Sequence, residues 1–253
     1  FVGQEHMNRG LWEKGYCDVR LTHRLSMALS SEENRHTNPF EFYRGDEVLY
    51  RQPAEYSAQR LSADRRIEKG RGELVDGALL YRPKDFSSAN FMSVRVLQDL
   101  LRAVVFPNSM PPERRFALSA EDQRFLLHAM SMLPRECAHP RYDHSTYYDS
   151  YVKFFMFGDN KAPMPRHIRS FNKVGLAYGY LIDNAYIVDF ERGVEFMLTA
   201  VISANENGIY NDGQYEYDEI SFPFLANLGR VFYEREVQRK KEVVPDLSEF
   251  KLH

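Results

Sequence analysis

The sequence predicts an α+β fold, in which a helical region is followed by a three-stranded antiparallel sheet and a packed C-terminal helix. Residues 91–105 carry apolar side chains along one helical face. Three strand-like segments follow one another between residues 168 and 203, and a capped helix begins at Ser221. Helices that precede a run of neighbouring strands indicate α+β rather than alternating α/β organisation.

Length and composition are those of a globular protein. The chain has 253 residues, and its 43% apolar and 14% aromatic content can fill a sizeable core. We therefore predict a single domain over residues 1–253. It is mainly helical or irregular over residues 1–165, and residues 166–253 hold the sheet and the last helix.

Charge and hydropathy argue against several kinds of partner. A net charge of −3 gives no general attraction to nucleic acid or to anionic membranes. No apolar run approaches the roughly 18 residues that cross a bilayer, and we expect no signal peptide in this sequence. The two cysteines, Cys17 and Cys137, do not make a disulfide framework. We expect no nucleic-acid partner, no membrane span and no cofactor.

The N-terminal half contains one helix and much irregular chain. A helix is predicted over residues 1–16, where apolar residues recur at helical spacing as far as Gly15. Residues 30–80 are polar and irregular, with short strand-like pieces at 48–50 and 78–81. This part of the chain is expected to contribute little regular structure.

Three helices are expected in the middle of the chain. The first covers residues 91–105 and is ended by Pro107. The second covers about 119–134 and opens with Ser-Ala-Glu-Asp, a capping box. The third covers residues 147–157 and stops at the following glycine. Their methionine and phenylalanine residues are expected in the core.

Three strands and one helix complete the fold. The strands are predicted at about 168–176, 179–189 and 194–203, with Asn184 interrupting the middle strand and a hairpin turn at 191–193. The last helix opens with Ser-Phe-Pro, in which the serine is the cap and the proline occupies the first turn. Its basic end suits the negative end of the helix dipole.

A lysine and a glycine stand close together at the head of the strands. Lys173 is followed by Val174 and Gly175 in the first predicted strand. Glycine allows a ligand to approach the backbone closely, and lysine supplies a compact positive charge. This short pattern suits the binding of an anionic substrate.

Two segments resemble a known family. The sequences Phe-Asn-Lys-Val-Gly-Leu-Ala-Tyr-Gly-Tyr at 171–180 and Val-Glu-Phe-Met-Leu-Thr-Ala at 194–200 are similar to class A β-lactamase-related serine hydrolases. These belong to the penicillin-recognising superfamily, and the similarity is closest to a Bacteroidetes-type group. Shorter similar stretches extend it over nearly the whole chain, at residues 16–25, 85–107, 211–213 and 223–225.

The resemblance implies a set of roles for the short pattern. Members of the family use Ser-x-x-Lys, Ser-Asp-Asn and Lys-Thr-Gly motifs, and the serine attacks an acyl carbon. On this resemblance Lys173 is the lysine of the third motif and faces the substrate carboxylate. Val174, in place of the hydroxyl residue, Gly175 and Leu176 line the substrate, and the Leu176 N–H is one oxyanion donor. Glu33 is the candidate for a loop glutamate that handles protons.

The resemblance also implies that this chain is a C-terminal portion. The first two motifs are expected upstream of Phe1, together with the N-terminal strands of the sheet. The strings Ser150-x-x-Lys153 and Ser170-x-x-Lys173 are interpreted as chance matches, because the family places its nucleophile far upstream of Lys-x-Gly. Without the N-terminal strands, the strand at 194–203 has an unpaired apolar edge. We expect another segment or self-association to cover that edge.

Two functions follow from these observations. The first is part of a serine hydrolase that acts by acyl transfer on an amide or β-lactam-like bond of a small or peptide-like substrate, with this chain alone inactive. The second is a non-catalytic binding or structural module on the same fold. The family resemblance implies a periplasmic or cell-envelope location.

Three further groups of residues have alternative interpretations. Cys137, His139, Asp143 and His144 could bind zinc, although a polar surface loop is the default and no metal is expected. The acidic loop at 205–219 could bind calcium but lacks an EF-hand pattern. Tyrosines could line a groove for sugars or peptides, or serve in packing. They are the residues at 147, 148, 151, 178 and 180.

Overall fold

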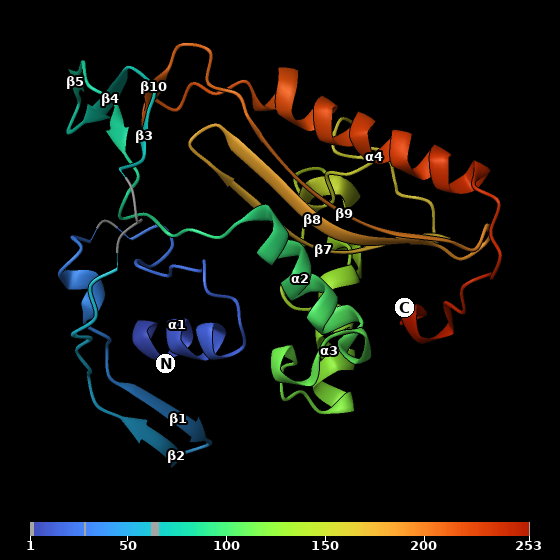
Figure 1. The fold of residues 1–253 in the computed structure, drawn as a ribbon, viewed down its shortest axis with the longest axis horizontal. Helices are drawn as coiled ribbons and strands as arrows, with labels where there is room; N and C mark the ends of the chain where they lie inside the picture. Colours follow the sequence, from blue (N-terminus) through green and yellow to red (C-terminus); the bar gives the residue numbers. More distant parts are fainter. Residues whose placement is uncertain (1–2, 28, 62–65, 253) are drawn as a thin grey trace. The chain divides into compact units, whose positions relative to one another are not determined.

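The computed structural model in Figure 1 describes residues 3–27, 29–61 and 66–252. The chain divides into two compact units, Phe1–Val96 (unit 1) and Leu97–His253 (unit 2). The single domain over residues 1–253 stays a prediction. The first two residues of the predicted N-terminal helix lie outside the described residues.

Unit 1 begins with helix α1 (Gln4–Glu13), in agreement with the predicted N-terminal helix. Asn8 is buried in this helix and holds the chain that follows it. Its Nδ2 donates to the Leu21 carbonyl at 2.8 Å, and its Oδ1 accepts from the Leu21 N–H at 2.8 Å. Tyr16 and Val19 are fully buried in the intervening segment. A buried amide with both groups bonded therefore organises the start of the unit.

The rest of unit 1 holds short antiparallel strand pairs between longer irregular segments, and two of the strands fall on the strand-like pieces predicted at 48–50 and 78–81. The pairs are β1 with β2, β3 with β6 and β4 with β5. Most of their side chains are exposed, so the alternation that identifies a half-buried strand is weak. The strands are β1 (Phe40–Arg44), β2 (Glu47–Gln52), β3 (Glu68–Lys69), β4 (Gly72–Val75), β5 (Ala78–Leu80) and β6 (Lys84–Asp85).

Two of the three predicted middle helices are confirmed. They are α2 (Val94–Val105) and α3 (Ala120–Ser131). The capping box at the start of α3 is present, because Ser119 Oγ accepts from the Asp122 N–H at 3.0 Å and the Asp122 carboxylate accepts from the Ser119 N–H at 3.2 Å.

The helix predicted over residues 147–157 is wrong. The structure has a single 3-10 turn, Asp149–Val152, followed by turns. The backbone N–H groups of Phe154 and Phe155 donate to the Asp183 carboxylate, at 2.9 and 3.2 Å, rather than continuing a helix. A buried acceptor from another part of the chain thus replaces the helical hydrogen bonds.

The predicted three-stranded antiparallel sheet is present in unit 2. Its strands are β7 (Ile168–Ala177), β8 (Tyr180–Asp189) and β9 (Val194–Ser203), in the order β7-β8-β9. The expected interruption at Asn184 is wrong, because this residue pairs with both neighbouring strands. Sequence order and spatial order coincide, as in a meander.

A tight turn joins the first two strands. Tyr178 and Gly179 both have positive φ angles, 56° and 79°, as a two-residue type I′ hairpin requires. A Cβ atom at Gly179 would lie 2.5 Å from the Ala204 carbonyl oxygen. Glycine is therefore required here both by the backbone conformation and by the neighbouring chain.

The two faces of the sheet are covered by different helices (Figure 1). On one face, Phe171 and Tyr186 pack with Leu101 of α2 and Leu127 of α3. On the other face, strand residues such as Ile187 pack in a cluster that includes Leu225 of α4 (Phe222–Gln238). The sheet is thus the middle layer of unit 2. The described helices are all too short or too polar to cross a bilayer.

The start of α4 differs from the predicted capped helix. A π-helical turn, Tyr217–Ser221, leads into α4. Ser221 is fully buried, and its hydroxyl makes no capping bond and has no partner among the described residues. The short strand β10 (Ile209–Tyr210) precedes this turn. The predicted serine cap is therefore wrong, although the position of the helix is confirmed.

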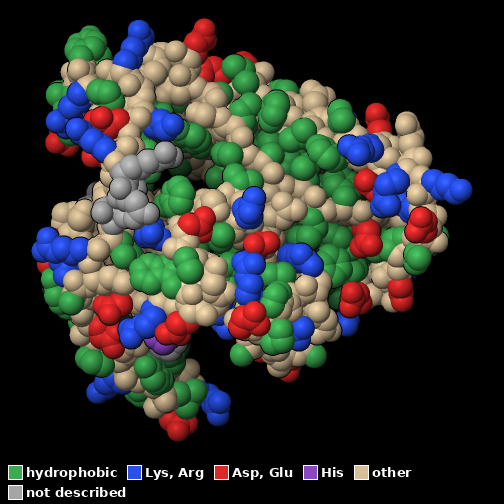
Figure 2. Space-filling view, viewed as in Figure 1, with side chains coloured by type: hydrophobic (Ala, Val, Ile, Leu, Met, Phe, Trp, Pro, Cys, Tyr) green, Lys and Arg blue, Asp and Glu red, His purple; other side chains and the backbone are tan. Residues whose placement is uncertain are grey.

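Strands β7 and β9 are the two edge strands of the sheet within the described part of unit 2. The sheet order leaves one edge of β7 and one edge of β9 without a partner strand. Figure 2 shows apolar side chains at the surface where β8 and β9 run in Figure 1. Val201 on β9 is 41% exposed. Within the described residues the strand at 194–203 therefore has one edge without a partner strand, and the apolar character of that edge stays a prediction.

Candidate functional site

The Lys-x-Gly pattern lies on the edge strand β7. Lys173 is exposed, and strand alternation places it on the face of Phe171, which is the face covered by α2 and α3. Its Nζ donates to the Val174 carbonyl at 2.6 Å. A positively charged side chain therefore lies on a strand that has a partner strand on one side only within the described sheet.

A polar row crosses the sheet from Lys173. Lys173 pairs with Asn184, which in turn pairs with Thr199. The Asn184 Nδ2 donates to the Leu97 carbonyl at 2.8 Å, and its Oδ1 accepts from Thr199 Oγ1 at 2.7 Å. The amide is thus fixed beside the lysine. Sequence reasoning missed this row because the three residues lie on three different strands.

Gly175 and Leu176 leave the strand accessible. Gly175 has no positive φ, and an added Cβ would meet only the Ile182 side chain, at 3.9 Å. The protein itself therefore does not require glycine at this position. Leu176 is 52% exposed, which is unusual for a large apolar side chain at a strand end. Both observations fit a surface that another molecule approaches.

Val174 lies on the opposite face from Lys173. Its side chain packs against the cluster that contains Phe154 and Phe155. A valine here contributes apolar packing, and it offers no hydroxyl to a substrate. In this arrangement only the backbone of Val174 can take part in binding.

Three buried polar side chains lie directly next to this stretch. Lys153 Nζ donates to Asn172 Oδ1 at 2.5 Å, and Asn172 Nδ2 donates to Asp183 Oδ1 at 2.8 Å. Burial lowers the pKa of Lys153 to about 8 and raises the pKa of Asp183 to about 6. Desolvation outweighs the attraction between the two charges at both residues. We call these three residues the Lys153 network.

The two Ser-x-x-Lys strings do not form serine–lysine pairs among the described residues. Ser150 is buried, and its Oγ donates to the Asn160 carbonyl at 2.7 Å. Ser170 is buried in β7, and its hydroxyl has no partner among the described residues. Lys153 and Lys173 bond elsewhere. The interpretation of both strings as chance matches stays a prediction.

Glu33 lies in unit 1, in the 3-10 turn Glu33–Arg35. Its carboxylate accepts from the Ser30 N–H and hydroxyl, each at 2.7 Å. The side-chain hydrogen bond from Ser30 and then the backbone one hold the pKa of Glu33 below its usual value. These contacts fix the carboxylate to its own turn, and they describe a local structural role.

Neither of the two segments considered for metal binding, 137–144 and 205–219, provides a set of metal ligands among the described residues. No group of three or more His, Cys, Asp or Glu side chains there could hold a metal ion. Asp143 instead accepts from the Ser145 hydroxyl at 2.6 Å. In the acidic loop, Asp212 accepts from Asn207 and from the Gln214 N–H, at 2.7 and 3.0 Å. Local turns use these carboxylates.

The tyrosines considered as the lining of a groove lie in two groups, one around Tyr151 and one around Tyr178. Tyr151 contacts both Tyr147 and Tyr148, with ring centroids 4.9 and 6.0 Å away. Tyr178, at the hairpin turn, contacts Tyr210 at 6.3 Å. No ring contact joins the two groups among the described residues, so the structure does not show one continuous aromatic groove.

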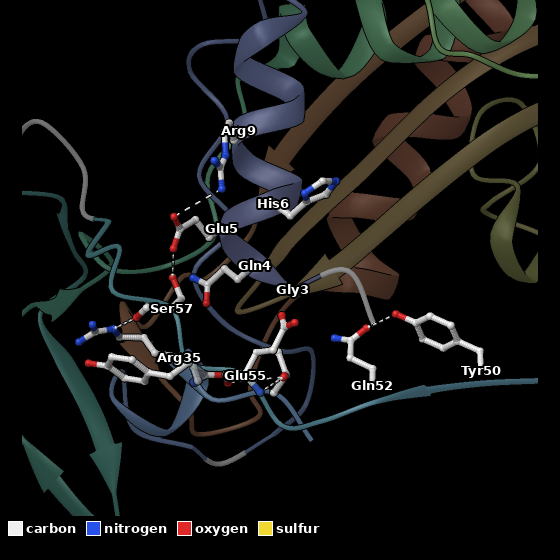
Figure 3. A pocket seen from close by; sticks show the side chains of 13 residues that line it. Gly3, Gln4, Glu5, His6, Arg9, Arg35, Tyr50, Gln52, Glu55 and Ser57 are labelled. Carbon is white, nitrogen blue, oxygen red and sulfur yellow. Dashed lines mark hydrogen bonds and ion pairs between the residues drawn. The ribbon is translucent and has the colours of Figure 1, made fainter. Parts of the chain in front are cut away.

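Unit 1 contains a separate polar pocket of about 460 Å³ (Figure 3). Ser57 Oγ donates to the Glu5 carboxylate at 3.0 Å, and Arg9 lies 3.6 Å from the same group. The Gln4 Oε1 atom is buried and has no partner among the described residues. The pocket could admit a small polar molecule, but none of the residues predicted from the sequence as site residues lines it. Its lining also includes His6, Asn34, Arg35, Gln52, Glu55 and Tyr56.

Comparisons of the chain with known protein families, with curated proteins and with solved structures found no match. The case for a function therefore depends on the geometry of β7 and its surroundings. The resemblance of residues 171–180 to the β-lactamase-related hydrolases stays a prediction from the sequence.

Proposed function

We propose that this chain supplies part of the active site of a serine hydrolase related to the class A β-lactamases. The enzyme acts by acyl transfer on an amide or β-lactam-like bond of a small or peptide-like substrate. Lys173 binds the substrate carboxylate, and the Leu176 N–H donates to the oxyanion. The nucleophilic serine belongs to a Ser-x-x-Lys segment upstream of Phe1.

The observation that carries the proposal is the placement of Lys173 and Gly175 on an edge strand. Lys173 is exposed, the fold does not require glycine at position 175, and the outer edge of β7 is unpaired within the described sheet. The order of three antiparallel strands followed by a C-terminal helix also fits the resemblance. A carboxylate near Lys173 would gain a charge-assisted hydrogen bond.

Binding of a carboxylate-bearing β-lactam to the 253-residue chain tests the role of Lys173. We expect weak binding that falls about tenfold in K173M, the equivalent of one charged hydrogen bond. The matched control is K240M, because Lys240 is an exposed lysine of the same unit just after α4. Titration calorimetry measures both. Equal affinity of wild type and K173M would contradict the proposal.

The chain alone is predicted to show no turnover. Hydrolysis of a nitrocefin-like substrate by the pure chain would contradict this prediction and would make Ser150 the nucleophile to test. In a longer parent protein, a covalent serine probe separates the two functions. Labelling that is lost when a serine upstream of Phe1 is mutated supports the serine hydrolase function.

The second candidate function is a non-catalytic binding or structural module. Two observations favour it: Val174 carries no hydroxyl and packs away from Lys173, and unit 1 holds the polar pocket of Figure 3. In this case the serine probe labels no residue of the longer parent.

The proposal includes a partner for the apolar edge of β9 and a periplasmic or cell-envelope location. The partner is either an N-terminal strand pair or a second copy of the chain. The unpaired edge of β9 in the described sheet supports this part of the proposal. Size measurement by light scattering tests it, and a stable monomer with a well-behaved surface would contradict it.

A further inference from the structure

The Lys153 network is a set of buried charges at the edge of the proposed site. Lys153 is 2% exposed, Asn172 6% and Asp183 0%. Charges at such depth are costly unless hydrogen bonds satisfy them. Asp183 accepts from Asn172 Nδ2 and from the N–H groups of Phe154 and Phe155. Lys153 Nζ donates to Asn172 Oδ1 and to the Met130 carbonyl, each at 2.5 Å.

The Lys153 network connects β7 to neighbouring segments of unit 2 through Asn172. Asn172 Nδ2 also donates to the Val152 carbonyl at 2.8 Å. Through Asn172, strand β7 is therefore joined to the segment around Val152, to the end of α3 at Met130 and to β8 at Asp183. The edge strand has no strand neighbour on this side within the described sheet. These side-chain bonds add to the backbone pairing of β7 with β8.

The charges also fix the orientation of the Asn172 amide. Its oxygen accepts from the ammonium of Lys153, and its nitrogen donates to the carboxylate of Asp183. The reverse orientation would place the amide NH₂ against the ammonium and the amide oxygen against the carboxylate. The backbone of the next residue is that of Lys173. A fixed Asn172 side chain therefore restrains the strand where the proposed site begins.

We propose that Lys153, Asn172 and Asp183 are positioning residues, which hold residues 173–176 of β7 in the conformation that binds an anionic ligand. The role of the ligand rests on the proposed function, whereas the restraint on the strand does not. None of the three residues contacts the substrate in this arrangement. They act through the backbone of β7.

The network is expected to respond to pH just above neutrality. Lys153 faces Asp183 on β8, Arg169 on β7 and Glu136 in the turn Pro134–Glu136. Burial has the largest effect and lowers its pKa to about 8, and Arg169 also lowers it, while Asp183 and Glu136 raise it. Loss of the Lys153 proton leaves the Asp183 carboxylate without a countercharge. Asn172 then loses its charged donor.

Backbone amide resonances of residues 173–176 in the ¹⁵N-labelled chain report on this restraint. We expect them to titrate together between pH 6.5 and 9 with a midpoint near 8 in wild type, and not to titrate in K153M. The matched control is R239M, because Arg239 pairs with Glu236 near the end of α4. R239M is expected to keep the titration.

Hydrogen exchange gives a second measurement, and wild type alone can supply it if K153M does not fold. Exchange of the β7 amides that pair with β8, corrected for intrinsic pH dependence, is expected to rise roughly tenfold between pH 7 and pH 9. Amides that show no titration near pH 8 and unchanged protection would overturn the positioning role.

Ligand binding separates this inference from the proposed function. If the amides titrate and a carboxylate-bearing β-lactam binds more weakly above pH 8, both are supported. If the amides titrate but no β-lactam binds at any pH, the positioning network stands and the proposed function fails. If the β-lactam binds equally at pH 7 and pH 9 and the amides do not titrate, the network is overturned and the proposed function stands.

Discussion

Gly175 is set apart from other glycines of the sheet by what surrounds it. The tight turn makes Gly179 indispensable, because its φ is positive and a Cβ atom would approach the Ala204 carbonyl oxygen at 2.5 Å. At Gly175 a Cβ would make an ordinary contact of 3.9 Å with Ile182. One glycine therefore serves the fold, and the other leaves room beside Lys173.

The substitution Gly175→Ala tests this distinction. We expect the free energy of unfolding to stay unchanged or to rise by up to about 1 kcal/mol, because alanine loses less backbone entropy on folding. Affinity for the carboxylate-bearing β-lactam should fall about tenfold. Urea unfolding and calorimetry measure the two effects. The control Gly179→Ala is expected to destabilise unit 2 by more than about 1 kcal/mol. Similar destabilisation by both substitutions would argue against a ligand-related role.

At the level of elements, two helix starts look alike in sequence and differ in structure. Ser119 and Ser221 each stand at the start of a helix. Ser119 completes a capping box with Asp122, whereas the Ser221 hydroxyl is buried after a π-helical turn and has no partner among the described residues. A serine at a helix start is therefore a cap only where its backbone leaves the helical conformation.

The two serines should respond in opposite ways to alanine. Ser119→Ala removes the cap of α3 and should lower the free energy of unfolding by about 1 kcal/mol. Ser221→Ala removes a buried hydroxyl without a partner and should leave stability unchanged or raise it by about 1 kcal/mol. Urea unfolding followed by circular dichroism compares them. A loss of 1 kcal/mol in Ser221→Ala would show that the hydroxyl is bonded in solution.

The sheet and most helices of unit 2 were predictable because their signals are local. Strands β7 to β9 alternate or run apolar between turn residues, and α3 opens with its cap. The helix expected at residues 147–157 failed because its N–H groups bond to Asp183, which is 28 and 29 positions away from Phe155 and Phe154. Contacts of this kind have no local signature.

The same limit applies to the site. Lys173 and Gly175 could be found from their short spacing along one strand. The sequence did not show that Lys153, Asn172 and Asp183 bond to one another. Lys153 is 19 positions away from Asn172, and Asn172 is 11 positions away from Asp183. The hairpins of unit 1 were underestimated because their exposed strands lack a buried face to set the pattern.

For the whole molecule, the Lys153 network affects how folding stability depends on pH. The pKa of Asp183 is raised to about 6, so the folded state holds this proton more strongly than the unfolded state. Its contribution to stability is complete below about pH 4 and is lost as pH rises through 6. The pKa of Lys153 is lowered to about 8, so its contribution is complete above about 10.4 and is lost as pH falls through 8. The pair stabilises least between pH 6 and pH 8.

A comparison of wild type with Asp183→Asn tests this behaviour, and loss of the Asp183 charge also lowers the pKa of Lys153 in the variant. Between pH 7 and pH 5, wild type should gain roughly 1 kcal/mol of unfolding free energy relative to the variant, because only wild type takes up the extra proton. Groups with lowered pKa, such as Asp159 and Asp189, are present in both proteins. Their contributions to the unfolding free energy therefore cancel when the two proteins are compared. Urea midpoints at the two pH values provide the measurement. Parallel pH profiles would contradict the raised pKa of Asp183.

The two hairpins of the sheet have a kinetic consequence. Strands β7, β8 and β9 are consecutive, and each pairs with the next through a short turn. The chain must close only small loops to form every strand pair, and short loops are closed at low entropic cost. Sheets of such low contact order can form early in folding. Residues 168–203 can therefore complete their strand pairing without waiting for contacts with distant parts of the chain.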